Sequence, residues 1–246
     1  MLTEAAAVKP AAVSAPLLQV RGLEAWYGES HVLHGIDFDV APGEVVTLLG
    51  RNGAGKTTTL KAIMGILTKR KGSVQFMGRE LIGLPARAIA RAGIAFCPEE
   101  RGIFSSLSVE ENLMLPPTIR EGGLSRNEVL DMFPNLRERL HSQGTKLSGG
   151  EQQMLAIGRI LRTGAKFLLL DEPTEGLAPV IVQQIGRTLK ALKQRGFTIV
   201  LVEQNFHFAA SVADRHYVVE EGRVVDQIAN ADLEANLGKL HAYLGV

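Results

Sequence analysis

The chain has 246 residues, of which 46% are hydrophobic and 22% are charged, as expected for a globular protein with a large buried core. Lys and Arg total 27 and Asp and Glu total 26, so a net charge of +1 gives no electrostatic footprint for nucleic acid. The single cysteine, Cys97, excludes an internal disulfide and favours a reducing, cytosolic setting. No apolar run reaches the ~18 residues that span a bilayer, so any work at a membrane needs other chains to cross it.

Residues 1–16 are rich in Ala and Pro and are expected to form a flexible tail ahead of one domain, residues 17–246. Several later segments alternate between apolar and polar residues, which is typical of antiparallel strands with one solvated face. They predict an antiparallel side-sheet. These segments are Leu18 to Trp26, Val32 to Val40, Ser73 to Met77 and His216 to Val225.

Three short, continuously apolar runs predict strands that are buried on both faces: Val45 to Leu49, Phe167 to Leu170 and Thr198 to Val202. Helical patterns follow the first two runs, at Thr57 to Leu67 and Pro179 to Lys193. Strands that alternate with helices in this way indicate a parallel sheet, so the fold class is α/β with a mixed core sheet.

The pattern changes to short helices between residues 101 and 146. Two capping boxes mark helix starts there, Ser108 with Glu111 and Ser125 with Glu128, because each serine and glutamate can satisfy free backbone N–H groups. We therefore expect a helical subdomain inserted into the α/β core.

The segment Gly50-Arg-Asn-Gly-Ala-Gly55-Lys56-Thr57 matches the P-loop pattern, between a predicted strand and a predicted helix. Its glycines let backbone N–H groups converge on phosphates, Lys56 can reach the β and γ phosphates, and the Thr57 hydroxyl can ligate Mg²⁺. A glycine-rich turn without a ligand is the alternative. The predicted ATP-binding residues here are Gly50, Asn52, Gly53, Ala54, Gly55, Lys56, Thr57 and Thr58.

A second acidic motif follows the predicted strand that begins at Phe167. Asp171 would stand at the carboxyl edge of the sheet, where it can hold Mg²⁺ through water. The next residue, Glu172, is the candidate for polarising the attacking water, with Lys56 as a catalytic partner. A solvated acidic turn is the alternative for this pair.

The peptide Leu147-Ser148-Gly149-Gly150-Glu151-Gln152-Gln153 begins another helix, because Ser148 and Glu151 form a third capping box. It resembles the LSGGQ signature of ABC ATPases, and it precedes the Asp-Glu strand as it does in that family. Together the motifs resemble an ABC nucleotide-binding domain over residues 17–246. The resemblance implies a P-loop NTPase core with an antiparallel β side-sheet and a helical subdomain.

The resemblance also implies roles for particular residues. Tyr27 occupies the place of an aromatic residue that stacks on adenine, although a buried core tyrosine is the alternative. In this family two subunits meet head to tail, and the signature residues of one contact the γ-phosphate held by the other. The implied cofactors are ATP and Mg²⁺. The signature residues are Ser148, Gly149, Gly150 and Glu151.

Three positions depart from the common ABC pattern. Glu99 replaces a glutamine at the Mg²⁺ and coupling position, and a carboxylate can still bind the metal or its water. Gln204 replaces the switch histidine, and an amide can donate to the γ-phosphate but cannot take up a proton. Ala178 replaces a usual aspartate. A slow or degenerate site is one interpretation of these changes.

The segments Pro98-Glu-Glu-Arg101, Val202-Glu-Gln-Asn205 and the ending Ala242-Tyr-Leu-Gly-Val246 resemble the smaller ATP-binding subunit of bacterial branched-chain amino-acid importers, which favours a working variant. That resemblance implies a second ATPase subunit, two membrane permeases, an indirect periplasmic solute-binding protein and a place on the cytoplasmic face of the inner membrane. In isolation the chain could form a homodimer.

Three alternatives remain: a urea or short-chain amide importer, a soluble ABC ATPase acting on nucleic acid or ribosomes, and an ATP-binding module without turnover. The near-zero net charge disfavours nucleic acid as a partner. In the importer interpretation, Phe104, Leu107 and Leu113 are candidates for a groove that receives a permease helix, with core packing as their alternative role.

Overall fold

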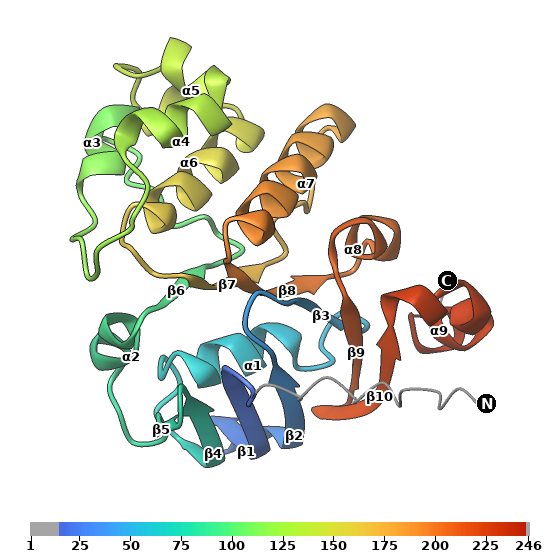
Figure 1. Ribbon diagram of the computed structural model, residues 1–246. Coiled ribbons are helices and arrows are strands. Elements are labelled where there is room, and N and C mark those ends of the chain that lie inside the picture. Colours follow the sequence, from blue (N-terminus) through green and yellow to red (C-terminus); the bar gives the residue numbers. More distant parts are fainter. Residues whose placement is uncertain (1–14, 245–246) are drawn as a thin grey trace, which may run out of the picture.

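The computed structural model describes residues 15–244, which form two sheets with helices around them (Figure 1). The larger sheet has strand order β10-β9-β3-β8-β7-β6 and the smaller sheet has order β2-β1-β4-β5. The strands are β1 (Leu18–Tyr27), β2 (Ser30–Val40), β3 (Val45–Leu49), β4 (Arg70–Phe76), β5 (Arg79–Glu80), β6 (Ile94–Cys97), β7 (Phe167–Asp171), β8 (Thr198–Glu203), β9 (Arg215–Glu220) and β10 (Arg223–Ala229). The helices are α1 (Lys56–Ile63), α2 (Ala86–Ala92), α3 (Val109–Met114), α4 (Arg126–Met132), α5 (Pro134–Glu138), α6 (Gly149–Leu161), α7 (Pro179–Gln194), α8 (Phe206–Val212) and α9 (Leu237–Leu244).

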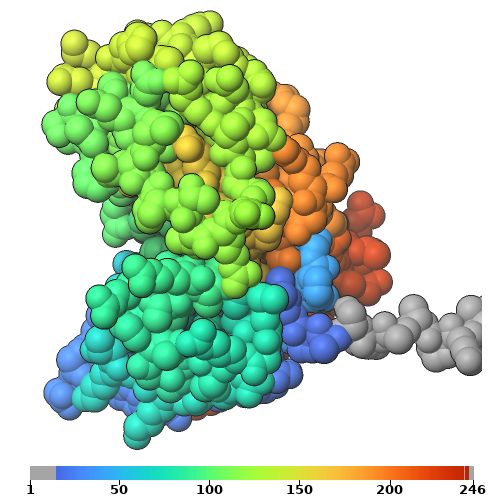
Figure 2. Space-filling view, turned by 60° about the vertical axis from the view of Figure 1, so that its left-hand side comes forward, coloured from blue at the N-terminus to red at the C-terminus, as the bar shows by residue number. Residues whose placement is uncertain are grey.

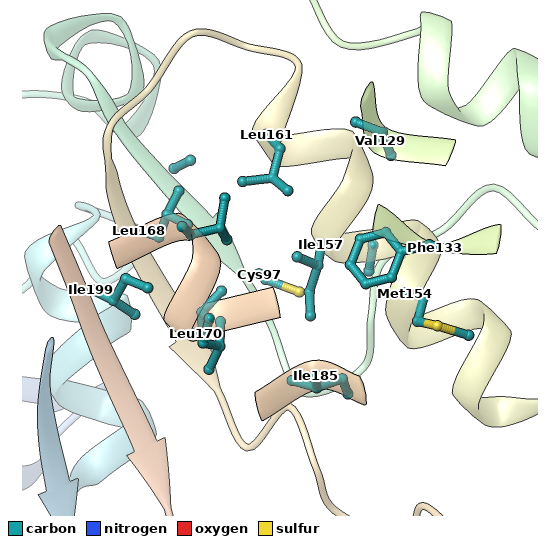
Figure 3. Close-up of a cluster of buried hydrophobic side chains, with 14 of the residues drawn as sticks. Cys97, Val129, Phe133, Met154, Ile157, Leu161, Leu168, Leu170, Ile185 and Ile199 are labelled. Atoms are coloured by element: carbon teal, nitrogen blue, oxygen red, sulfur yellow. The ribbon is translucent and has the colours of Figure 1, made fainter. Parts of the chain in front are cut away.

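The larger sheet is parallel from β9 through β6, and only β10 runs antiparallel to its neighbour. Its central strands are buried on both faces, so alternate residues of one strand enter different cores. Leu168 and Leu170 of β7 pack on the side of the helices, in the cluster shown in Figure 3. Phe167 and Leu169 pack on the opposite side, against α1 and the smaller sheet. The predicted α/β fold with a mixed sheet is therefore confirmed.

The smaller sheet is antiparallel throughout, and α1 lies between it and the larger sheet (Figure 1). Leu18 and Val20 of β1 share a buried cluster with Leu60 and Ile63 of α1. Apolar contacts with both sheets hold α1, the helix that follows the P-loop. The antiparallel side-sheet therefore helps to fix the position of the phosphate-binding loop.

Two expected boundaries are wrong. The segment His216 to Val225 is not one strand of the side-sheet, because Glu221 and Gly222 have φ of 44° and 70° and turn the chain between β9 and β10 of the larger sheet. The helix expected to reach Leu67 ends at Ile63, since Gly65 follows with φ of 69° and left-handed backbone cannot continue a helix.

Residues 101–146 contain α3, α4 and α5, and within the described chain this range contains no strand. The side chains of Ser108 and Ser125 accept hydrogen bonds at the two predicted helix starts, which confirms both capping boxes. Helices α3 and α5 contact α6, and Figure 3 shows Phe133 beside Ile157 of α6. The helical layer therefore includes α6 in addition to the predicted range.

Cys97 lies at the end of β6, beneath α6 in the same cluster (Figure 3). The amide Nε2 of Gln153 lies 3.8 Å from the sulfur, and burial raises the pKa of the thiol to about 12. The thiol is therefore protonated and shielded at neutral pH.

Most of the expected flexible tail, residues 1–16, lies outside the described residues. Between residues 15 and 244, every helix is too short or too polar to cross a bilayer.

Candidate functional site

The P-loop joins the end of β3 to the start of α1. Gly55 precedes the helix with φ of 107°, a conformation that favours glycine. A Cβ atom on Gly50 would lie 2.2 Å from the carbonyl oxygen of Val219, so only glycine fits against β9 there. The backbone N–H of Gly222 donates to the carbonyl of Ala54 at 2.9 Å. Strand β9 and the turn that follows it thus pack against the P-loop and fix its backbone.

Lys56 is buried at the first position of α1, with 4% of its side chain exposed. Its ammonium group donates to the carbonyl oxygens of Gly50 at 2.8 Å and Arg51 at 3.0 Å. Burial lowers the pKa of Lys56, while Glu172 and Asp171 act in the opposite direction. Carbonyl groups of the P-loop therefore hold the Lys56 ammonium next to the backbone segment where phosphate would bind.

Two of the three expected metal ligands, Thr57 and Asp171, meet in the structure. The Thr57 hydroxyl donates to Asp171 Oδ1 at 2.9 Å, whereas Asp171 Oδ2 is buried and has no hydrogen-bond partner among the described residues. Burial raises the pKa of Asp171 to about 6. A buried oxygen without a donor fits a water molecule on a cation, so this pair could hold Mg²⁺.

No cage of three or more His, Cys, Asp or Glu side chains is present between residues 15 and 244. Magnesium is commonly held by one or two carboxylates, water and substrate phosphates, so its site needs no such cage.

Glu172 directly follows β7 and connects the site to β8. It has φ of 44°, and its backbone N–H donates to the carbonyl of Val202 at 3.0 Å. The side-chain amide of Gln204 donates to Glu172 Oε2 at 2.8 Å, and the Lys56 ammonium lies 3.7 Å from Glu172 Oε1. The strained backbone is thus held in place by contacts on both carboxylate oxygens.

The side chains of Lys56, Glu172 and Gln204 border a cavity of about 420 Å³. Glu99 lines it, on the loop that follows β6, together with Glu172 and Gln204. Val32 and Glu175 also line it, although neither is a predicted site residue. The predicted residues that line the cavity are Asn52, Gly53, Gly55, Lys56, Thr57, Thr58, Glu99, Glu172 and Gln204.

Tyr27 does not line this cavity. It stands at the end of β1 with 45% of its surface exposed, so the alternative of a buried core tyrosine is wrong. Stacking on adenine stays a prediction. Among the three groove candidates, Leu113 is fully buried in the core of the helical layer, and Phe104 is 46% exposed.

The signature residues begin α6 and do not line the P-loop cavity. The Ser148 side chain accepts from the backbone N–H of Glu151 at 3.3 Å, and the Glu151 carboxylate accepts from the N–H of Ser148 at 2.7 Å, which confirms the third capping box. A Cβ on Gly150 would lie 2.9 Å from Ile181, whereas Ser148 remains exposed. Gly149 follows Ser148 as the first residue of the helix.

Sequence patterns did not predict a buried hydrogen bond between the loop after β7 and the end of β8. The Thr174 hydroxyl donates to Glu203 Oε1 at 2.8 Å, and Glu203 is 3% exposed. Burial raises the pKa of Glu203 to about 7. Because Glu203 precedes Gln204, this bond ties the loop after Glu172 to the switch position. A charged residue at the end of an otherwise apolar strand was the available signal.

Ala178 stands immediately before α7 and makes no side-chain cap hydrogen bond. The loop that contains the third departure is therefore held by its backbone and by Thr174.

Comparisons with known proteins agree with this geometry. Residues 33–175 match the family described as ABC transporter. The chain is 44% identical over 232 residues to the high-affinity branched-chain amino acid transport ATP-binding protein BraG of Pseudomonas aeruginosa, covering 93% of this chain and 100% of that protein. It is 34% identical to the lipopolysaccharide export system ATP-binding protein LptB of Escherichia coli K12, covering 93% and 97%.

A solved ATP-binding subunit of an ABC transporter superposes with a TM-score of 0.79 at 29% identity, covering 94% of this chain and 100% of that one. The predicted resemblance is therefore confirmed, and the chain belongs to the ABC transporter family of ATP-binding ATPases.

Proposed function

We propose that this chain binds ATP with Mg²⁺ at the P-loop cavity and hydrolyses it to power uptake of branched-chain amino acids. The observation that carries the proposal is the arrangement around Glu172, whose carboxylate is held by Gln204 and lies near Lys56, next to the Thr57–Asp171 pair. This arrangement joins a group for activating water to a cradle for phosphate in one cavity.

Glu172 acts on the attacking water in this proposal. Its two oxygens face different neighbours, so it can accept a proton from water while Gln204 fixes its orientation. Lys56 is held by the P-loop carbonyls and supplies positive charge where charge develops on the transferred phosphate. Gln204 can also donate to the γ-phosphate, but it cannot carry the proton away.

Thr57 and Asp171 would hold Mg²⁺ together with Glu99, which lines the same cavity as Thr57. When bound, Mg²⁺ neutralises phosphate charge. The unpartnered Asp171 Oδ2 supports this assignment, because a metal-bound water would satisfy that buried oxygen.

A second ATPase subunit completes the site in this proposal. Ser148, Gly149, Gly150 and Glu151 lie outside the P-loop cavity of their own chain, so they are available to the nucleotide held by a partner. The partner is a different ATPase subunit in the assembled importer, and the isolated chain can pair with a second copy. Two permeases and, indirectly, a periplasmic binding protein complete the complex at the cytoplasmic face of the inner membrane.

Similarity to BraG supports amino acids as the solute, since 44% identity extends over the full length of that protein. The 34% identity to LptB supports lipopolysaccharide export less strongly. This chain would not itself contact the solute, so a transport experiment is needed to decide between an amino acid and urea.

The test is uptake of labelled leucine and labelled urea by cells that lack this gene, complemented with the wild-type chain, Glu172→Gln or Glu234→Gln. Glu234 is exposed and distant in sequence from the motifs, so its variant is the matched control. We expect leucine uptake to be restored by the wild type and the control but not by Glu172→Gln. Normal leucine uptake in the deletion strain would overturn the amino-acid assignment.

A further inference from the structure

A second cavity, of about 720 Å³, shares no residue with the P-loop cavity. It lies where α2, the end of β4 and the loop after α3 meet, and its apolar lining includes Phe76, Ala88 and Ala92. Figure 2 shows this part of the chain in teal, below the green helical layer. The location is therefore independent of the nucleotide site.

Four arginines from three segments line this cavity, and no Asp or Glu does. Arg79 belongs to β5, Arg87 and Arg91 are four residues apart on α2, and Arg120 lies on the loop after α3. The Arg120 guanidinium donates to the carbonyl of Ala92 at 2.5 Å, which fixes this arginine against the end of α2. All four side chains belong to exposed residues, so a ligand can reach them.

These positive charges are not neutralised by the protein. In the described chain, arginines such as Arg21, Arg126 and Arg215 have carboxylate partners, whereas none of the four in the cavity forms an ion pair. The neighbouring carboxylate of Glu80 is already engaged. It accepts from the Ser73 hydroxyl and from the backbone N–H groups of residues 74, 81 and 82.

Gathering like charges around one hollow is unfavourable unless an anion offsets them, and arginines four apart on a helix repel each other. Guanidinium groups match phosphate oxygens through two parallel N–H donors, and the apolar lining reduces competition from water. We propose that this cavity binds a phosphate-bearing anion, either the headgroup of an acidic phospholipid or a soluble phosphate compound. The site goes beyond ATP hydrolysis and uses none of its residues.

The test compares the wild type with Arg87→Ala/Arg91→Ala. Replacing Arg187 and Lys190 by alanine removes the same charge from exposed residues of α7, which line a separate cavity that also contains Glu175, and is the matched control. One arm measures co-sedimentation with vesicles of phosphatidylcholine alone or with 30% phosphatidylglycerol. The other titrates inorganic pyrophosphate calorimetrically into protein saturated with Mg·ADP, so that the P-loop is already filled.

We expect one probe to bind the wild type and the control, and to bind Arg87→Ala/Arg91→Ala at least tenfold more weakly. Loss in the vesicle arm identifies a lipid headgroup, and loss in the pyrophosphate arm identifies a soluble ligand. Arg87→Lys/Arg91→Lys keeps the charge without the paired donors and should bind with intermediate strength. Equal binding by the cavity variant and the control, or no binding of either probe, would overturn the proposal, whatever the ATPase activity.

Discussion

The P-loop cavity and the N-terminus of α6 are the two motif-bearing regions of this chain, and they differ in completeness. Around the cavity, Lys56, Asp171 and Glu172 are linked to neighbours from other segments. At α6, Ser148 is exposed and its capping bonds go only to Glu151. In the proposed function, this difference means that the chain itself assembles the P-loop half of an ATP site, whereas Ser148 and its neighbours serve the nucleotide of a second subunit.

The largest effect is expected from Glu172→Gln. The glutamine keeps the size of the side chain and an oxygen for the amide of Gln204, but it cannot accept the proton of water. Turnover should fall roughly 100-fold or more, the scale of lost general-base catalysis, with the Kd for ATP nearly unchanged. Phosphate release and equilibrium nucleotide titration measure the two quantities, and undiminished turnover would remove the role given to Glu172.

The next largest effect is expected from Ser148→Arg, which tests the exposed N-terminus of α6. A bulky cation at this position should block contact with the partner's nucleotide and suppress turnover by about tenfold or more, a barrier increase of about 1.4 kcal/mol. ATP binding by the isolated subunit should persist. Ser148→Ala loses the same helix cap, which costs about 1 kcal/mol of stability, and therefore separates a weakened helix from a blocked interface. Loss of ATP binding in the monomeric arginine variant would contradict the division between the two regions.

Thr174→Val tests whether the assembled half depends on the bond between Thr174 and Glu203. Valine keeps the shape of the side chain but removes the hydrogen-bond donor to a buried carboxyl group, which costs about 1.5 kcal/mol. If the transition state for hydrolysis is destabilised by that whole amount, the rate falls roughly tenfold. We expect a decrease of up to that size in kcat with little change in KM. Thr174→Ser should restore kcat because it restores the hydroxyl. If kcat stays low in the serine variant, the effect of Thr174→Val comes from altered packing and not from the lost hydrogen bond.

The smallest effect concerns the scaffold beneath the P-loop. His216 of β9 is buried, its Nδ1 lies 2.6 Å from the Thr47 hydroxyl of β3 and its Nε2 lies 2.9 Å from Asn230 Oδ1. Burial lowers the pKa of His216 below the ordinary value of 6.5. Below pH 6.5 the unfolded chain binds a proton that the folded chain does not, so the free energy of unfolding falls by at most about 1.4 kcal/mol per pH unit.

Urea unfolding of the wild type and His216→Gln at pH 8 and pH 5.5 checks this sign. The wild type should lose more stability than the variant on acidification. Asp171 and Glu203, whose pKa values are raised, act in the opposite direction, but both proteins contain them and their contribution cancels in the difference. An equal loss in the two proteins would exclude His216 as the source.

The features predicted well from the sequence are local ones. The P-loop and the three capping boxes depend on residues within one turn or one loop, so their spacing alone indicates their geometry. The membership of β9 in the larger sheet depends on pairing with β3, about 170 residues away, and alternation within the segment carried no sign of it. The bond between Thr174 and Glu203 likewise joins segments that are separate in the sequence, the loop after β7 and the end of β8. Burial of Leu113 depended on the packing of α3 against α6.

The buried thiol of Cys97 has a practical consequence. Since the chain's single cysteine is protonated and buried, electrophilic reagents that react with thiolates should leave the native protein unlabelled. A cysteine introduced on the surface would then be the sole reactive handle, without any need to delete the natural one. Fluorophores or crosslinkers could therefore report the approach of two subunits during the ATP cycle on an otherwise unaltered chain.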